Sequence, residues 1–174
     1  FRPAYRRRLL ELENSLTMYA VFGQSGKRLV PERPPTNYYL LPSGNNILGK
    51  QEHTRLRPMM MTGVRDSSEG SLQSGKNGII LLRLGYWEDV ERFRSSVRHA
   101  RPVDYLDLKN SVAAEMIDEA EKRWGNYSGT IEQLAVGSPL TFRDELSAPE
   151  GCAYGAMHCQ GQYNPEARTR LPGL

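Results

Sequence analysis

The sequence predicts an α+β fold in which helices pack against one sheet, and three patterns carry that prediction. Residues 78–84 form an unbroken apolar run, which indicates a strand in the middle of a sheet with both faces covered. Residues 104–124 place apolar side chains at every fourth position, which is typical of a helix that covers one face of a sheet. Residues 131–136 indicate a further strand that returns the chain to the sheet after this helix.

The N-terminal part predicts a helix followed by a strand. Residues 3–13 place three apolar side chains on one helical face, and these are Tyr5, Leu9 and Leu12. Three consecutive arginines, Arg6–Arg8, lie on the rest of this helix. They favour a solvated helix face over a nucleic-acid patch, because no aromatic residues for base stacking alternate with them. Residues 16–22 alternate in a way that suits a strand.

The middle of the chain combines short strands with segments that form turns. Residues 38–41 and 57–64 are predicted strands, and residues 86–93 begin a short helix. Glycine, proline, serine and asparagine predict loops or turns at residues 23–36, 43–46, 66–77 and 125–129. A basic segment, residues 92–101, contains Arg92, Arg94, Arg98, His99 and Arg101. We expect it at the protein surface rather than on a phosphate group.

Three consecutive methionines, Met59, Met60 and Met61, lie in one of these predicted strands. Because thioether side chains adapt to irregular shapes, they are suited to lining a pocket for a long apolar substrate. Ordinary filling of the hydrophobic core is the interpretation that residue type alone favours. The methionines are therefore candidate substrate-contacting residues, with core filling as the alternative.

The most informative stretch begins at the strand of residues 131–136. Ser138 is a favoured N-cap residue and Pro139 a favoured first helical residue, so we expect a short helix to start there. A turn follows that consists of Gly151, Cys152, Ala153, Tyr154 and Gly155. The two glycines indicate a backbone that passes close to a flat or bulky group. A strand, helix and turn that simply pack well together are the alternative.

Length and composition limit the classes of function. At 174 residues the chain suits one domain, and its net charge of +3 is too small to indicate nucleic-acid binding. No apolar run approaches the roughly 20 residues of a membrane span, and no secretory signal is visible. Two cysteines, Cys152 and Cys159, make no disulfide framework, so a reducing cytoplasm is expected. These cysteines and the three scattered histidines offer no metal-ligand spacing.

Signatures of several large enzyme classes are missing. The sequence contains no Gly-x-Gly-x-x-Gly dinucleotide fingerprint, no Walker loop and no Gly-x-Ser-x-Gly nucleophile elbow. The three histidines also provide no convincing Ser/His/Asp set. The chain begins with Phe1 rather than methionine, which suggests that it is a piece of a longer protein.

The motif Ser138-Pro139-Leu140-Thr141, followed by the turn from Gly151 to Gly155, resembles a pattern of the FAD-dependent phytoene desaturases, carotenoid isomerases and retinol saturases. In that family the first residue is usually threonine, and serine here keeps the capping hydroxyl. The helix pattern Pro3-x-Tyr5-x-x-x-Leu9 is similar to the start of the second half of the family's substrate domain. The C-terminal residues 168–174 resemble the lead-in to the family's last flavin strand.

The resemblance implies a mixed, mostly antiparallel sheet with helices packed on it, as a single substrate-binding domain fragment over residues 1–174. It implies that FAD is bound only by a full-length parent, with flavin-binding segments on both sides of this chain. The implied partners are that flavin-binding domain and a hydrophobic small molecule, such as a polyene, that exchanges hydride with the flavin in a dry cavity. Peripheral membrane contact is left open, and nucleic acid is not expected.

The resemblance also implies roles for particular residues. Tyr154 and Gly155 would lie near the flavin or the reacting part of the substrate, with a core aromatic as the alternative for Tyr154. The residues expected to support this turn are Ser138, Pro139, Thr141 and Gly151. Two other classes of function stay open: a non-catalytic protein-interaction module, suggested by the basic helix and a proline-rich loop, and a nucleic-acid-binding domain, suggested by Arg6–Arg8.

Overall fold

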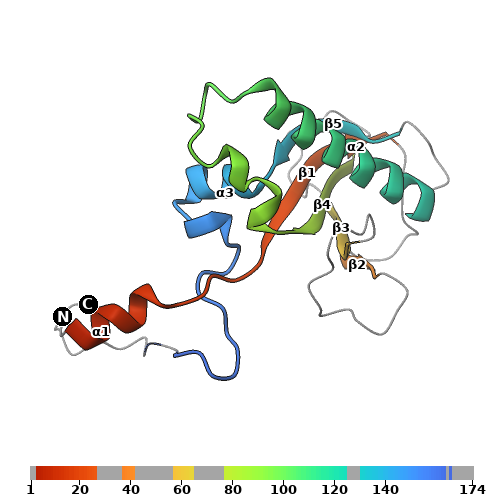
Figure 1. Cartoon of the computed structure of the whole chain (residues 1–174). Coiled ribbons are helices and arrows are strands. Elements are labelled where there is room, and N and C mark those ends of the chain that lie inside the picture. The colour runs from red at the N-terminus through yellow and green to blue at the C-terminus, as the bar shows by residue number, and fades with distance from the viewer. Residues whose placement is uncertain are drawn as a thin grey trace, which may run out of the picture.

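The computed structural model describes residues 3–26, 37–41, 57–64, 77–124, 130–163 and 165. They form a five-stranded sheet, a long helix across it, a short helix at the end of the last strand, and an arm that carries the first helix away from this body (Figure 1). The helices are α1 (Pro3–Leu10), α2 (Val103–Trp124) and α3 (Pro139–Leu146). The strands are β1 (Thr17–Ser25), β2 (Asn37–Leu40), β3 (Met59–Val64), β4 (Asn77–Gly85) and β5 (Glu132–Gly137).

The sheet has the strand order β2-β3-β4-β1-β5, and every pairing among the described strands is antiparallel. The predicted α+β class is therefore confirmed. The apolar run of residues 78–84 lies in β4, which is the central strand, as its composition predicted. The prediction that both faces of this strand are covered holds for one face only, because side chains on the other face are half-buried.

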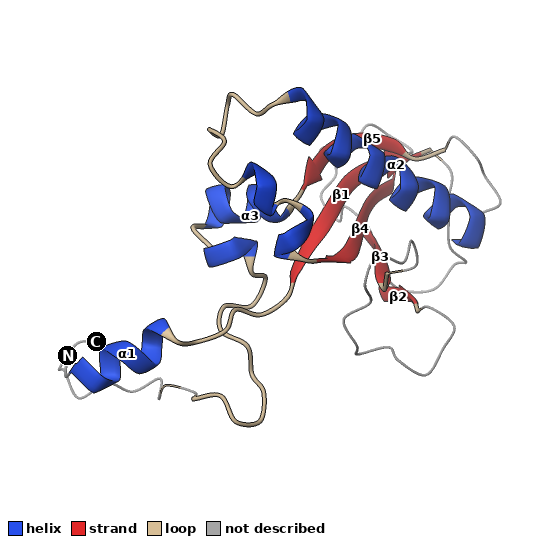
Figure 2. Ribbon diagram, in the orientation of Figure 1, coloured by secondary structure: helices blue, strands red, loops and turns tan. Residues whose placement is uncertain are grey.

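The hydrophobic core lies between the sheet and α2, which crosses one face of it (Figure 2). Alternate residues of β1, β3 and β4 point toward this helix, because successive side chains of a strand point to opposite faces. The buried strand residues are Tyr19, Val21, Met59, Met61, Ile79 and Leu81. The buried apolar residues of α2 are Tyr105, Val112, Ala113, Met116 and Ala120. Their helical spacing confirms the predicted amphipathic helix.

The opposite side of the sheet, called the open face below, is mostly apolar but incompletely covered, and its polar side chains include the hydrogen-bonded pair Gln24 and Glu132. Its large apolar side chains are Met18, Phe22, Tyr39, Met60, Ile80, Leu82 and Leu84. Tyr39 is 64% exposed and Phe22 is 44% exposed, while the others are half-buried. Among the described helices, α3 reaches this face at the end of β5, where the Phe142 ring lies beside Gly137. Large exposed apolar patches are common at surfaces that bind a ligand or a partner.

The arm consists of two segments that are far apart in the sequence, residues 3–16 and 153–163 (Figure 1). Their backbones pair through hydrogen bonds of 2.8–2.9 Å, donated by Ser15, Ala153 and Met157. Farther out, the rings of Tyr5 and Tyr163 meet edge to face with their centroids 6.4 Å apart. The two ends of the described chain therefore run side by side along the arm.

Two predicted element ends differ from the structure. Helix α1 ends at Leu10 rather than at residue 13, because the following residues pair with the C-terminal segment instead. Strand β1 continues to Ser25, into the segment predicted as a loop. This extension depends on a close approach by β5, since a Cβ atom on Gly23 would lie 3.0 Å from the carbonyl oxygen of Glu132.

Residues 86–93 form two short 3-10 turns, Trp87–Asp89 and Glu91–Phe93, in place of one helix. The Asp89 carboxylate closes the first turn by accepting a hydrogen bond of 3.1 Å from the backbone NH of Tyr86. Several predicted features lie outside the described residues. They are the loops or turns at 27–36, 43–46, 66–76 and 125–129 and the lead-in at 168–174.

Candidate functional site

The predicted helix start at Ser138 is confirmed. Ser138 has an extended backbone, and its Oγ accepts a hydrogen bond of 3.3 Å from the backbone NH of Thr141. Pro139 follows as the first helical residue. The Ser138 hydroxyl also pairs with the Tyr105 hydroxyl at 2.6 Å, and Ser138 has no exposed surface. This buried contact joins the start of α3 to the N-terminal part of α2.

The basic segment provides a second link between α2 and α3. The Arg101 guanidinium lies 5.4 Å from the centroid of the Tyr105 ring and forms an ion pair with Asp144, with 7% of the Arg101 side chain exposed. Arg98 pairs with Glu145 at 2.5 Å, nearer the surface. The expected surface placement is confirmed for Arg98, which is half exposed. It is wrong for Arg101, because this side chain is enclosed between the two helices.

Gly151 is fixed in place between α3 and β1. Its φ of +65° lies in the left-handed region, and a Cβ atom there would overlap the carbonyl oxygen of Pro139. Its own carbonyl oxygen accepts a hydrogen bond of 2.6 Å from the Thr17 hydroxyl. Only glycine fits this position. The structure therefore brings together the residues that were predicted to support the turn, which are Ser138, Pro139, Thr141 and Gly151.

Tyr154 and Gly155 lie past this junction, where the arm begins. The backbone NH of Tyr154 donates to the Ser15 hydroxyl at 3.0 Å, and the carbonyl oxygen of Gly155 accepts from the Ser15 NH at 2.8 Å. The Tyr154 side chain is 72% exposed, and Leu16, opposite it in the paired backbones, is 45% exposed. The alternative of a core aromatic is therefore wrong for Tyr154. Its position near a flavin stays a prediction.

The three methionines do not share one environment. Met59 and Met61 point into the core and are 3% and 1% exposed, whereas Met60 lies on the open face beside Leu82. Because side chains alternate along a strand, three consecutive residues of β3 do not line one side of it. Core filling, the interpretation favoured by residue type, describes Met59 and Met61. Met60 is the methionine that stays available for substrate contact.

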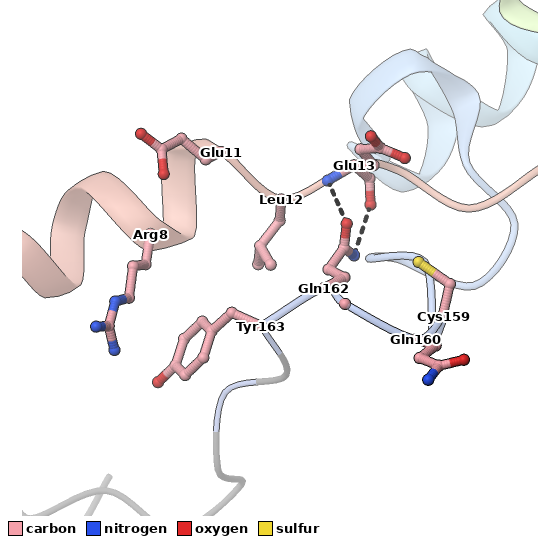
Figure 3. Close-up of a pocket in the computed structure, with 9 residues that line it drawn as sticks. Arg8, Glu11, Leu12, Glu13, Cys159, Gln160, Gln162 and Tyr163 are labelled. Atoms are coloured by element: carbon pink, nitrogen blue, oxygen red, sulfur yellow. Dashed lines mark hydrogen bonds between the residues drawn. The ribbon is translucent and has the colours of Figure 1, made fainter.

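A cavity of about 530 Å³ lies within the arm, between α1 and residues 159–163 (Figure 3). Its lining is Arg8, Glu11, Leu12, Glu13, Cys159, Gln160, Gly161, Gln162 and Tyr163. The Gln162 side-chain amide connects the two segments of the arm. It donates a hydrogen bond of 3.3 Å to the Glu13 carbonyl oxygen and accepts one of 3.0 Å from the Glu13 NH. None of the predicted site residues lines this cavity, and no sequence motif marks it. Its hydrogen bonds hold the two segments of the arm together.

Charged groups also gather at the edge of the core. Arg57 forms a two-pronged ion pair with Asp89, and this hydrogen bonding raises the pKa of the Arg57 guanidinium. Nearby Tyr19 is 1% exposed, and its hydroxyl has no hydrogen-bond partner among the described residues. Burial raises the pKa of the Tyr19 hydroxyl, so this group stays protonated and is unsuited to acid–base chemistry near neutral pH.

The described residues do not fit an FAD-binding site of their own. A dinucleotide site needs free backbone amides at the start of a helix that follows a strand, where they hold the pyrophosphate. Helix α3 follows β5 directly, but its start is closed by the buried residues Ser138, Pro139 and Leu140. Among the described residues, the start of α3 therefore offers no pyrophosphate site.

Among the described residues, no three histidine, cysteine, aspartate or glutamate side chains gather as they would around a metal ion. Cys152 is a buried free thiol and Cys159 an exposed one. Within the same part of the chain, no helix is both long enough and apolar enough to cross a bilayer.

No protein-family model matches the chain. Among curated proteins it is similar to all-trans-retinol 13,14-reductases of three vertebrates. The identity is 26% over 181 residues for Macaca fascicularis, covering 97% of this chain and 30% of that protein. It is 26% over 190 residues for Homo sapiens, covering 99% and 31%. It is 22% over 181 residues for Danio rerio, covering 97% and 30%.

The match is therefore unequal: it takes in nearly all of this chain, while the chain spans about 30% of the length of these curated relatives. The similarity includes residues 138–155, whose pattern first pointed to this group of enzymes. At low identity but over almost its whole length, this chain is a relative of the retinol saturase-like oxidoreductases, which confirms the resemblance.

Proposed function

We propose that this chain is the substrate-binding domain of a longer, retinol saturase-like oxidoreductase whose FAD is bound by other segments of the polypeptide. The relatives are named as reductases of all-trans-retinol, and the chain spans about 30% of their length. The closed start of α3 supports a domain without a dinucleotide site. The redox chemistry then belongs to the longer protein, while this domain binds and orients an apolar substrate.

The open face of the sheet is the observation that carries this proposal. It presents Phe22, Met60 and Leu82 on neighbouring strands, and a charged side chain, Glu132, lies at its β5 edge, where it accepts a hydrogen bond of 2.7 Å from Gln24. Sites for small apolar ligands are lined mainly by hydrophobic and aromatic side chains. All-trans-retinol is a long polyene that matches this surface chemically. We therefore assign the open face as one wall of the substrate site, with Met60 among its contacts.

The arm supports the second part of the proposal, a flavin-binding domain as the partner. Both ends of the described chain run along the arm, as the contact between Tyr5 and Tyr163 shows. A domain that the chain enters and leaves at one place is suited to insertion within a larger protein. The exposed side chains of Leu16 and Tyr154 lie where the arm meets the body. We propose that they face the flavin-binding domain.

The test uses the chain and its longer parent in parallel. We expect the longer polypeptide to purify with bound flavin and to act on all-trans-retinol or a related polyene. We expect this chain alone to bind all-trans-retinol, measured by the rise in retinol fluorescence on transfer to an apolar site. A parent without a glycine-rich fingerprint, combined with a chain that does not bind retinol, would overturn the proposal.

A protein-interaction module is the second candidate, and one observation favours it. Helix α1 has no buried residue, and its basic run Arg6–Arg8 is exposed. Helices of this kind often dock on another protein. This candidate would gain support if removal of α1 abolished binding of a partner protein while the longer polypeptide carried no flavin.

A further inference from the structure

Strands β1 and β5 meet at a β-bulge. Phe22 pairs with Ala135 and Gly23 pairs with Gln133, so Leu134 is an extra residue in β5. A bulge bends its strand and changes the direction of nearby side chains, and bulges are over-represented beside active sites. Leu134 is 58% exposed here and Phe22 is 44% exposed.

The bulge depends on the glycine that follows Phe22. A Cβ atom on Gly23 would lie 3.0 Å from the Glu132 carbonyl oxygen and 3.1 Å from the Ile131 side chain. A larger residue would therefore push β5 away from β1. Gly63 on β3 offers a contrast, because a Cβ atom there would meet no atom within 4 Å. The close approach at Gly23 is thus absent at Gly63, which makes Gly63 a suitable control position.

Phe22 is the most exposed large apolar side chain on the central strands β1 and β4 of the open face. Its register partners on the two sides are Ile80 and Ala135. Neither neighbour is charged, and beyond the bulge the charged residue Glu132 of this face accepts a hydrogen bond of 2.7 Å from Gln24. Hydrogen-bonded polar pairs, Gln24 with Glu132 and Thr62 with Asn37, flank this apolar surface at its two edges. Sites for small apolar ligands have such a lining, mainly hydrophobic with a few polar groups, so the chemistry of this face fits an apolar small molecule.

We infer that Phe22, set in position by the bulge at Gly23, is a substrate-contacting residue that helps to determine affinity for the polyene chain. This inference rests on the proposed function. The ring has about half of its surface left to bury against a ligand. From the free energy of burying a phenylalanine side chain, removal of the ring should weaken binding about three- to tenfold.

The experiment titrates all-trans-retinol against the full 174-residue chain and its variants by retinol fluorescence. We expect Phe22→Ser to weaken binding about three- to tenfold and Phe22→Leu to retain most of the affinity, because leucine is also apolar. Leu10→Ser is the matched control, since Leu10 is 77% exposed but lies on the arm. It should bind retinol as the unmodified chain does.

The bulge is tested with two glycine variants. Gly23→Ala should weaken retinol binding as Phe22→Ser does, whereas Gly63→Ala should not, with circular dichroism confirming that each variant is folded. Unchanged affinity of Phe22→Ser, or an equal loss in Leu10→Ser, would overturn the inference and leave the proposed function standing. If the unmodified chain binds no retinol, the proposed substrate-domain function fails, and the role of Phe22 fails with it.

Discussion

A Cβ atom on Gly151 would overlap the carbonyl oxygen of Pro139, so the turn after α3 and the start of α3 fit together only if residue 151 is glycine. The left-handed φ of Gly151 adds a second reason, because other residues rarely adopt it. The same residue accepts the hydroxyl hydrogen bond of Thr17 from β1. One glycine therefore joins the last helix, the turn and the sheet.

Gly151→Ala should destabilise the chain by about 2–4 kcal/mol, the sum of backbone strain and overpacking. Urea unfolding followed by circular dichroism measures this change. Gly155→Ala is the matched control, because Gly155 also has a positive φ, +71°, but a Cβ atom there would meet nothing within 4 Å. It should cost only about 1 kcal/mol from backbone strain. Equal effects of the two variants would show that the contact with Pro139 is unimportant.

The hydroxyl pair of Ser138 and Tyr105 predicts energetic coupling between α2 and α3. Ser138→Ala removes the N-cap hydrogen bond and the contact with Tyr105, so it should cost roughly 2 kcal/mol. Tyr105→Phe removes only the second contact and should cost about 1 kcal/mol. In a double-mutant cycle the two losses should be less than additive, because they share one hydrogen bond. Strict additivity of the free energies of unfolding would contradict this link.

Two neighbouring acidic residues of α3 allow a comparison of the stability that a buried and an exposed ion pair contribute. Asp144 pairs with Arg101, whose side chain is 7% exposed, whereas Glu145 pairs with Arg98, whose side chain is 49% exposed. Asp144→Asn should destabilise the chain by about 3 kcal/mol, because it leaves Arg101 buried without a full charge partner. Glu145→Gln should cost less than about 1 kcal/mol. Urea unfolding of both variants checks the order, and the reverse order would contradict the assignment.

The sequence was sufficient for features that depend on local pattern. The helical repeat from Leu108 to Ala120 predicted α2, and the pair Ser138-Pro139 predicted the start of α3. Alternation along a strand also distinguishes Met60 from Met59 and Met61, but the prediction grouped the three methionines together. These features involve residues only a few positions apart, so their physical causes are visible in the sequence itself.

The sequence could not supply features that depend on distant residues. Arg101 was expected at the surface, but its partner Asp144 lies 43 positions away and no local pattern indicates it. The pairing of Ser15 with Gly155, which ended α1 early, spans most of the chain. The side on which the sheet stays open depends on where α2 packs, since its apolar stripe can cover either face.

From the buried Tyr19 hydroxyl we predict that the free energy of unfolding decreases at alkaline pH. Burial raises the pKa of Tyr19 above its ordinary value of 10.0, so the unfolded chain loses this proton at a lower pH than the folded chain does. Its contribution to stability is therefore complete below about pH 10 and decreases as the pH rises further. Urea unfolding at neutral and alkaline pH should show a steeper alkaline loss for the unmodified chain than for Tyr19→Phe.

The same variant tests the environment of the hydroxyl at neutral pH. Because the Tyr19 hydroxyl has no hydrogen-bond partner among the described residues, Tyr19→Phe should leave the free energy of unfolding unchanged or raise it by up to about 1 kcal/mol. Tyr105→Phe serves as the comparison, since that hydroxyl is paired with Ser138. A loss of stability in Tyr19→Phe as large as that in Tyr105→Phe would show that Tyr19 has a partner.

The closed start of α3 leads to a prediction about the cofactor. Since Ser138, Pro139 and Leu140 are buried, the amides of this helix are not free to hold a pyrophosphate, and the chain alone should bind no FAD. Purification in the presence of added FAD, followed by a visible absorption spectrum of the desalted protein, checks this expectation. A yellow, flavin-loaded preparation would contradict it. In such a case the flavin would be held either at the start of α3 or elsewhere on the chain, and Ser138→Ala distinguishes these two explanations. Flavin held at the start of α3 should be lost when the Ser138 hydroxyl is removed. Flavin held elsewhere on the chain should be retained.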